Sequence, residues 1–239
     1  FGTAYLLRAR IYRSSGEPGR ALASAARAVR LAREAGERRL EAEALARLGQ
    51  LHLDVDRMVE AEAQLRESLR VAEEIEDRRG QALARTFLGI LLWENSDPSA
   101  AAMLERAAAL SGEMGLNRIT ALVSGVRARI ALLQAHDHAA ALAWSAAAED
   151  LVRRFGAELA DRIVILGTRA LVLETSGLVD EARAIERDLL DRLQRENTRV
   201  RSPLRRLRQS RAGQRLLRAV SSADGPLYPR VRIETSASE

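Results

Sequence analysis

Apolar residues recur at helical spacing through most of this chain, and short turns separate the stretches that carry them. This spacing predicts amphipathic α-helices. They fall into consecutive pairs, expected at residues 2–14 and 18–35, 38–54 and 57–75, 78–94 and 98–113, 117–134 and 137–154, and 157–175 and 179–197. Because the pairs recur about every 40 residues, the sequence predicts an all-α solenoid over residues 1–197, built from five stacked hairpins.

The turns between the expected helices carry residues that suit helix ends. Gly16 and Gly177 favour the left-handed position that follows a helix. Pro18 and Pro98 favour the first turn of the next helix, where a missing N–H is tolerated. The second helices of three hairpins are expected to end at glycine, namely Gly36, Gly115 and Gly156.

Small residues recur at matching places in the hairpins. On the first helices they are Ala9, Gly49, Gly89, Ala128 and Ala170, followed three positions later by Tyr12, His52, Leu92, Ala131 and Leu173. On the second helices they are Ala21/Ala28, Ala61/Ser68, Ala100/Ala107, Ala140/Ala147 and Ala182. Since the distance between packed helices depends on the side chains at their contact, these positions predict where helices touch.

This arrangement resembles the tetratricopeptide repeat family over about residues 2–197. The usual period of that repeat is about 34 residues. The longer period here resembles the extended repeats of bacterial signal-transduction ATPases, kinases and regulators, and of some cell-polarity adaptors. The resemblance implies a right-handed superhelix whose first helices line a concave groove that takes a peptide or helix of a partner.

The resemblance also assigns the residues of that groove. They are Arg10, Arg13, Gln50, Leu53, Asp54, Ile90, Trp93, Glu94, Arg129, Leu132, Leu171 and Glu174. An apolar middle flanked by charge suits an amphipathic helix or an extended peptide, and Trp93 is the candidate anchor. The alternatives are that another part of the protein covers this stripe, that the superhelix is tightly wound, and that Trp93 packs against Pro98 or the next hairpin. Trp144 is expected to be structural.

Basic residues gather near the C-terminus. Eight of the 38 Arg lie within residues 199–218, which hold no acid, so the rest of the chain has 30 Arg against 33 acids. Residues 202–220 predict a further helix, and residues 221–239 predict a loosely ordered tail. The helix is interpreted as a cap on the last repeat. Alternatively it contacts an acidic partner, nucleic acid or anionic lipid through Arg205, Arg206, Arg208, Arg211 and Arg215.

The composition excludes several kinds of chemistry. The chain has no Cys, and all its basic residues are Arg, so thiol nucleophiles, thiolate metal sites and lysine-dependent P-loop or Schiff-base sites are excluded. His52 is expected to pack in the core. His136 and His138 flank Asp137 in a turn without a third nitrogen ligand, which makes a metal site unfavourable. No Gly-x-Ser-x-Gly sequence is present to activate a serine, so neither catalysis nor a cofactor is expected.

The sequence therefore predicts a non-catalytic protein-interaction or sensor domain. The absence of an 18-residue apolar run predicts no membrane span, and we expect a cytoplasmic protein. The chain opens at Phe1 inside a helical pattern and uses Arg in place of Lys throughout, so we expect a piece of a larger bacterial regulatory protein from a GC-rich genome. The alternatives are a nucleic-acid-associated regulator that uses the Arg-rich helix, and the regulatory region of a parent kinase, ATPase or protease.

Overall fold

The computed structural model describes residues 1–199, and every regular element in this range is a helix. The helices are α1 (Gly2–Ser14), α2 (Pro18–Glu34), α3 (Arg38–Asp54), α4 (Met58–Glu74), α5 (Arg78–Glu94), α6 (Ala100–Glu113), α7 (Asn117–Leu133), α8 (His138–Phe155), α9 (Leu159–Thr175) and α10 (Val179–Arg199). The predicted all-α solenoid is confirmed. Each predicted helix begins and ends within two residues of the corresponding observed helix. The right-handed sense of the superhelix stays a prediction. The helix expected at 202–220 and the tail at 221–239 lie outside the described residues.

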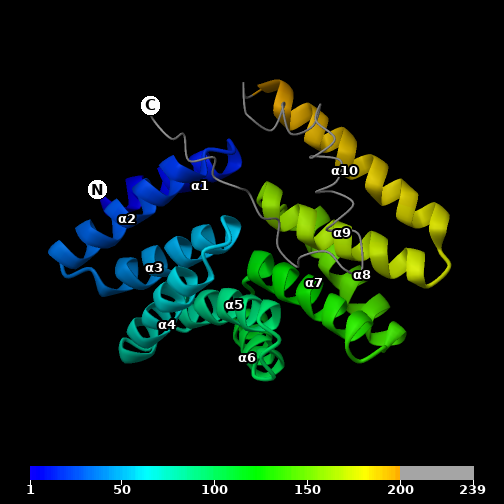
Figure 1. Ribbon diagram of the computed structural model, residues 1–239, viewed down its shortest axis with the longest axis horizontal. Helices are drawn as coiled ribbons and strands as arrows, with labels where there is room; N and C mark the ends of the chain where they lie inside the picture. Colours follow the sequence, from blue (N-terminus) through cyan, green and yellow to red (C-terminus); the bar gives the residue numbers. More distant parts are fainter. Residues whose placement is uncertain (200–239) are drawn as a thin grey trace, which may run out of the picture.

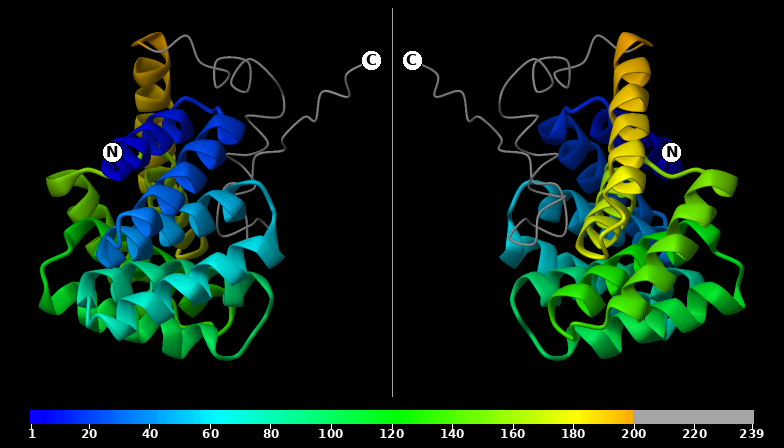
Figure 2. Two further views of the ribbon diagram at one scale, coloured as in Figure 1. Left: turned by 90° about the vertical axis from the view of Figure 1, so that its left-hand side faces the viewer. Right: turned by 90° about the vertical axis from the view of Figure 1, so that its right-hand side faces the viewer.

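The five hairpins follow one another around a curved path, from α1 and α2 through α5 and α6 to α9 and α10 (Figure 1). Each helix packs against its neighbours in sequence. The first helix of each hairpin also packs against the first helix of the next, as α3 does against α5 and α7 against α9. The first helices therefore form the inner layer of the curve, and the turned views in Figure 2 show the pairs stacked along it.

Most helices end in a left-handed residue followed by a hydrogen bond that reaches back five positions. After α1, Gly16 has φ 69° and the Glu17 N–H donates to the Tyr12 carbonyl at 2.8 Å. This is the Schellman arrangement, which satisfies carbonyls at a helix end. Asp56 and Glu76 adopt the same conformation, with φ of 61° and 54°. A left-handed conformation is unfavourable for residues with a Cβ, so packing and hydrogen bonding hold these turns in place.

The predicted contact positions on the second helix of the fourth hairpin are wrong by one residue, whereas Ala128 on its first helix is buried as predicted. Ala141 and Ala148 of α8 are fully buried, whereas the predicted contact residues Ala140 and Ala147 are half-buried and exposed. The turn before α8 explains the shift, because the Asp137 N–H donates to the carbonyl of Ala131, six positions back instead of five. This longer turn delays the helix by one residue and rotates its buried face.

The other predicted small positions lie where helices cross. At Gly49 of α3, an added Cβ would lie 2.5 Å from Leu65 Cγ of α4. At Gly89 of α5, it would lie 2.7 Å from Leu104 Cγ of α6. A Cβ at either position would force the facing leucine to shift, so glycine allows the close approach of the helices at these two crossings.

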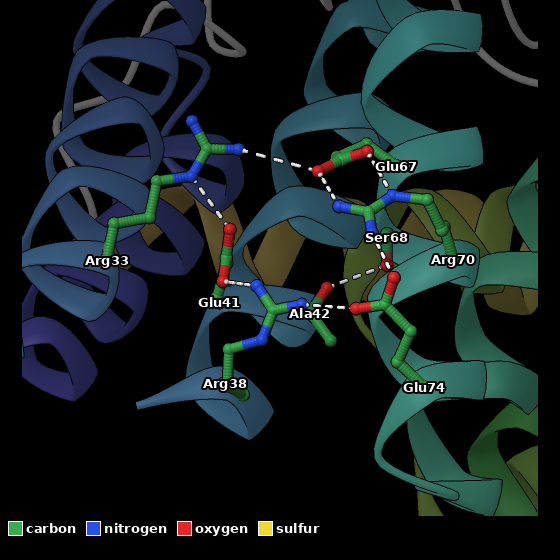
Figure 3. Close-up of polar contacts among 8 residues, drawn as sticks. All are labelled: Arg33, Arg38, Glu41, Ala42, Glu67, Ser68, Arg70 and Glu74. Atoms are coloured by element: carbon green, nitrogen blue, oxygen red, sulfur yellow. Dashed lines mark hydrogen bonds and ion pairs between the residues drawn. The ribbon is translucent and has the colours of Figure 1, made fainter. Parts of the chain in front are cut away.

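Ion pairs join the two helices of a hairpin where the first helix begins and the second ends. Arg38 begins α3 and contacts Glu74 at the end of α4 at 2.5 Å and Glu41 at 2.6 Å (Figure 3). Arg78 and Glu113 form the corresponding pair in the next hairpin. A cation at a helix start and an anion at a helix end are both unfavourable in the field of the helix dipole, and pairing them offsets this. Figure 3 shows the surrounding contacts of Arg33, Glu67, Ser68 and Arg70.

Candidate functional site

The two ends of the solenoid meet on its inner side through a cluster of ion pairs. Arg13, near the end of α1, donates from Nε to Asp54 Oδ2 at 2.7 Å and from Nη1 to Glu158 Oε2 at 2.8 Å. Its Nη2 lies 3.5 Å from Asp161 Oδ1 in the first turn of α9. Asp54 ends α3, and Glu158 directly precedes α9. One guanidinium therefore connects the first, second and fifth hairpins.

Two further arginines form the outer rim of this cluster. Arg10 Nε lies 3.2 Å from Glu158 Oε1, and Arg118 Nη2 of α7 lies 3.6 Å from the same oxygen. The side chains of Arg10 and Arg118 are 45% and 48% exposed, whereas those of Arg13 and Glu158 are 7% and 9% exposed. The cluster thus has a buried centre and a cationic rim that solvent reaches.

The pKa values of the two best-buried carboxylates of the cluster shift in opposite directions. Burial raises the pKa of Asp54, and Arg13 offsets this only in part. Burial acts in the same direction on Glu158, but the guanidiniums of Arg13, Arg47, Arg10 and Arg118 together hold the pKa of Glu158 below its ordinary value. Glu158 is therefore the carboxylate on which the positive charge of the inner face converges.

Local features of the last hairpins bring Glu158 to this place. The connection from α8 to α9 passes through Gly156, at φ 71° and ψ 172°, and reaches Glu158 in an extended conformation. At Gly125 of α7, an added Cβ would lie 3.1 Å from Ile165 Cγ1 of α9. The missing side chain lets α9 approach α7 closely, and this tightens the curve toward α1.

The residues assigned to an open groove are mostly buried. Leu53 and Ile90 belong to the largest apolar cluster of the core, and Leu132 and Leu171 pack together in another. Gln50 is also buried. These side chains fill the interior instead of lining an exposed apolar stripe, because the hairpins curve tightly. This arrangement is the tightly wound alternative that the sequence left open, and a partner-binding role for these residues stays a prediction.

The remaining groove residues have mixed surroundings. Trp93 is half-buried against the largest apolar cluster, Glu94 is half-buried, and Glu174 is exposed. Arg129 is 1% exposed. Burial lowers the pKa of Arg129, against the opposing charge of Glu94. Of the predicted set, only Arg10, Arg13 and Asp54 take part in the ion-pair cluster.

Glu158, Asp161 and Arg118 were not among the predicted site residues. Acids near the start of a helix interact favourably with the helix dipole. This local effect is enough to explain Glu158 and Asp161 in the sequence, so neither residue stands out as part of a site. Their partner Arg13 lies more than a hundred residues earlier.

The other candidate residues lie away from this cluster. His52 is half-buried, with a buried Nδ1 that has no hydrogen-bond partner among the described residues. His136 and His138 are exposed. Trp144 packs in the core with the Arg127 guanidinium 4.2 Å from its ring. The basic residues Arg205, Arg206, Arg208, Arg211 and Arg215 lie outside the described residues.

Neither a metal site nor a membrane span is found among the described residues. Within residues 1–199, no group of three or more His, Asp or Glu is placed to hold a metal ion. None of the helices in this part of the chain combines the length and apolar character needed to cross a bilayer. Comparison of the chain with protein-family models and with curated proteins finds no match.

Proposed function

We propose that this chain is a non-catalytic, tetratricopeptide-like interaction domain of a larger bacterial regulatory protein. It binds an acidic segment of a protein partner at the cationic rim of its inner face. The observation that carries this proposal is the convergence of Arg10, Arg13 and Arg118 on the single carboxylate of Glu158.

The geometry of the rim supports an acidic ligand. Arg10 and Arg118 come from α1 and α7, and nearly half of each side chain is exposed. Each guanidinium carries five N–H donors and shares one buried carboxylate with two other arginines. A ligand carboxylate at the rim would therefore gain charge-assisted hydrogen bonds without displacing the Arg13 pairs.

The same geometry argues against an apolar anchor at this place. Leu53, Ile90, Leu132 and Leu171 are covered, so a ligand would reach them only if the hairpins separated. We therefore expect charge to dominate recognition and the affinity to fall with added salt.

A random peptide library displayed on phage tests the proposal. Selection on the immobilised chain should enrich sequences rich in Asp and Glu. Those peptides should bind the Arg10→Glu/Arg118→Glu variant roughly thirtyfold more weakly, because two exposed pairs contribute about 1 kcal/mol each.

The control variant is Arg27→Glu/Arg30→Glu, which makes the same change in net charge on the exposed face of α2. It should keep full binding. Selection without enrichment of acidic residues, or equal loss of binding in both variants, would contradict the proposal.

A further inference from the structure

Glu158 occupies the cationic rim with its own carboxylate. Its Oε2 accepts a hydrogen bond from Arg13 Nη1 at 2.8 Å. Its Oε1 lies 3.2 Å from Arg10 Nε and 3.6 Å from Arg118 Nη2. One oxygen therefore holds the buried centre of the cluster, and the other fills the place on the rim where a ligand carboxylate is expected.

The contacts at Oε1 are the weaker half of this arrangement. They are longer than the hydrogen bond at Oε2, and nearly half of each rim side chain is exposed, whereas Arg13 is buried. Exposed ion pairs contribute little, because water competes for both charges and the long side chains lose conformational freedom. Arg10 and Arg118 can therefore leave Oε1 while Arg13 keeps its buried pair.

Helix capping does not explain the direction of the Glu158 side chain. Glu158 directly precedes α9, and in the described first turn of that helix no backbone N–H donates to its carboxylate. By contrast, Asp137 directly precedes α8 and accepts a hydrogen bond at 2.9 Å from the Ala140 N–H. The carboxylate of Glu158 is directed instead toward arginines of α1 and α7.

The rim arginines of the free protein therefore already have a counter-ion. Burial acts against the ionised form of Glu158, but the surrounding guanidiniums hold the pKa of this carboxyl below its ordinary value, so it is charged at neutral pH. Because Glu158 belongs to the same chain, it competes for the rim at a high effective concentration. A ligand carboxylate gains only the difference between its own contacts with the rim and those of Oε1.

We propose that Glu158 is a built-in competitor of the ligand. In the free protein its Oε1 occupies the rim, and an acidic segment of the partner displaces it from Arg10 and Arg118 while Arg13 keeps Oε2. This inference rests on the proposed function, because it concerns the same rim. It also makes the rim selective for segments with several acidic residues, since a single carboxylate only replaces the contacts that Oε1 already makes.

Fluorescence anisotropy with a labelled hexaglutamate peptide tests the competition. Glu158→Gln removes the charge of the internal carboxylate, so this variant should bind the peptide about tenfold more tightly than the unmodified chain. Circular dichroism establishes that each variant is folded at the temperature of the titration. If Glu158→Gln does not fold, Glu158→Asp decides the question, because its shorter side chain withdraws the carboxylate from the rim and should also tighten binding.

The matched control is Glu41→Gln. It neutralises another buried carboxylate shared by two arginines, Arg33 at 2.7 Å and Arg38 at 2.6 Å. Glu41 lies in the first turn of α3, whereas the cluster includes Asp54 at the end of that helix. The control changes the net charge equally and should leave the affinity within about twofold, because solvent and salt screen distant charges.

The gain in affinity should depend on the rim itself. When Arg10→Glu/Arg118→Glu is also present, Glu158→Gln should no longer tighten binding, because the arginines that it releases are gone. A general effect of net charge would instead raise the affinity in both backgrounds, and that result would contradict the competition.

The outcomes separate this inference from the proposed function. If the unmodified chain binds hexaglutamate through Arg10 and Arg118, but Glu158→Gln binds no more tightly than Glu41→Gln, the competition is overturned and the proposed function stands. If neither the unmodified chain nor Glu158→Gln binds the peptide, both are overturned.

Discussion

Replacing Arg13 with Met removes the guanidinium at the centre of the inner cluster while keeping most of the length of the side chain. Three carboxylates lie within 3.5 Å of that guanidinium, from Asp54, Glu158 and Asp161. Arg13 itself is 7% exposed, so water cannot replace its hydrogen bonds fully. Removing one partner of a buried ion pair costs about 3–5 kcal/mol, because it leaves charge buried without compensation.

This loss is large enough to measure by thermal and urea unfolding followed by circular dichroism. For a chain of this size, about 1 kcal/mol shifts the melting temperature by roughly 2–4 °C, so we expect Arg13→Met to lower it by about 6–20 °C. The matched control is Arg10→Met, which removes a half-exposed arginine with one ion pair to Glu158. Such a pair contributes at most about 1 kcal/mol.

Adding Glu158→Gln to Arg13→Met should recover part of the lost stability, because it removes one of the uncompensated charges. Equal melting temperatures for Arg13→Met and Arg10→Met would refute the reasoning, since the buried centre would then contribute no more than the exposed rim.

Three further changes test the packing, the turns and the pH dependence. Gly89→Ala should destabilise the chain by about 1–3 kcal/mol in urea unfolding, because the new Cβ would lie 2.7 Å from Leu104 Cγ. The control is Gly112→Ala, where a Cβ meets nothing within 4 Å, and it should stabilise the chain by up to about 1 kcal/mol. Equal changes in the free energy of unfolding for the two variants would contradict the close crossing of α5 and α6 at Gly89. Glu76→Gly should raise the melting temperature by relieving a φ of 54°, and a lower melting temperature would show that this turn is unstrained. Burial lowers the pKa of His52, so the unfolded chain binds its proton more readily and stability should fall as the pH drops below about 6.5. His52→Leu should remove that part of the pH dependence, whereas replacing the two exposed histidines with Gln should not.

Helices and their pairing could be predicted from the sequence because they depend on local patterns. Apolar spacing, turn glycines and Pro18 each act within a few residues, and the crossings at Gly49 and Gly89 recur at the period of the repeat. The error of one residue on α8 also has a local cause, in the turn that precedes this helix. One extra residue in the turn before α8 changes the buried face, and no residue type marks that turn as longer.

The candidate site could not be predicted in the same way. Small rotations between hairpins accumulate along a solenoid, so the final meeting of α1 with α9 depends on every crossing before it. The close approach at Gly125 contributes to this curvature, but the sequence does not show how far the curve closes. Arg13 and Asp54 form ion pairs with each other and, through Arg13, with Glu158, and their predicted contact with a partner stays a prediction.

The most direct test of the account is the distance between the two ends of the solenoid. The chain contains no cysteine, so Ser14→Cys and Arg154→Cys, at two exposed positions, provide the only sites for a pair of spin labels. Pulsed electron paramagnetic resonance should give one short, narrow distance distribution, which Arg13→Met converts to a longer and broader one. A broad distribution in the unmodified background, unchanged by Arg13→Met, would contradict closure of the solenoid through Arg13.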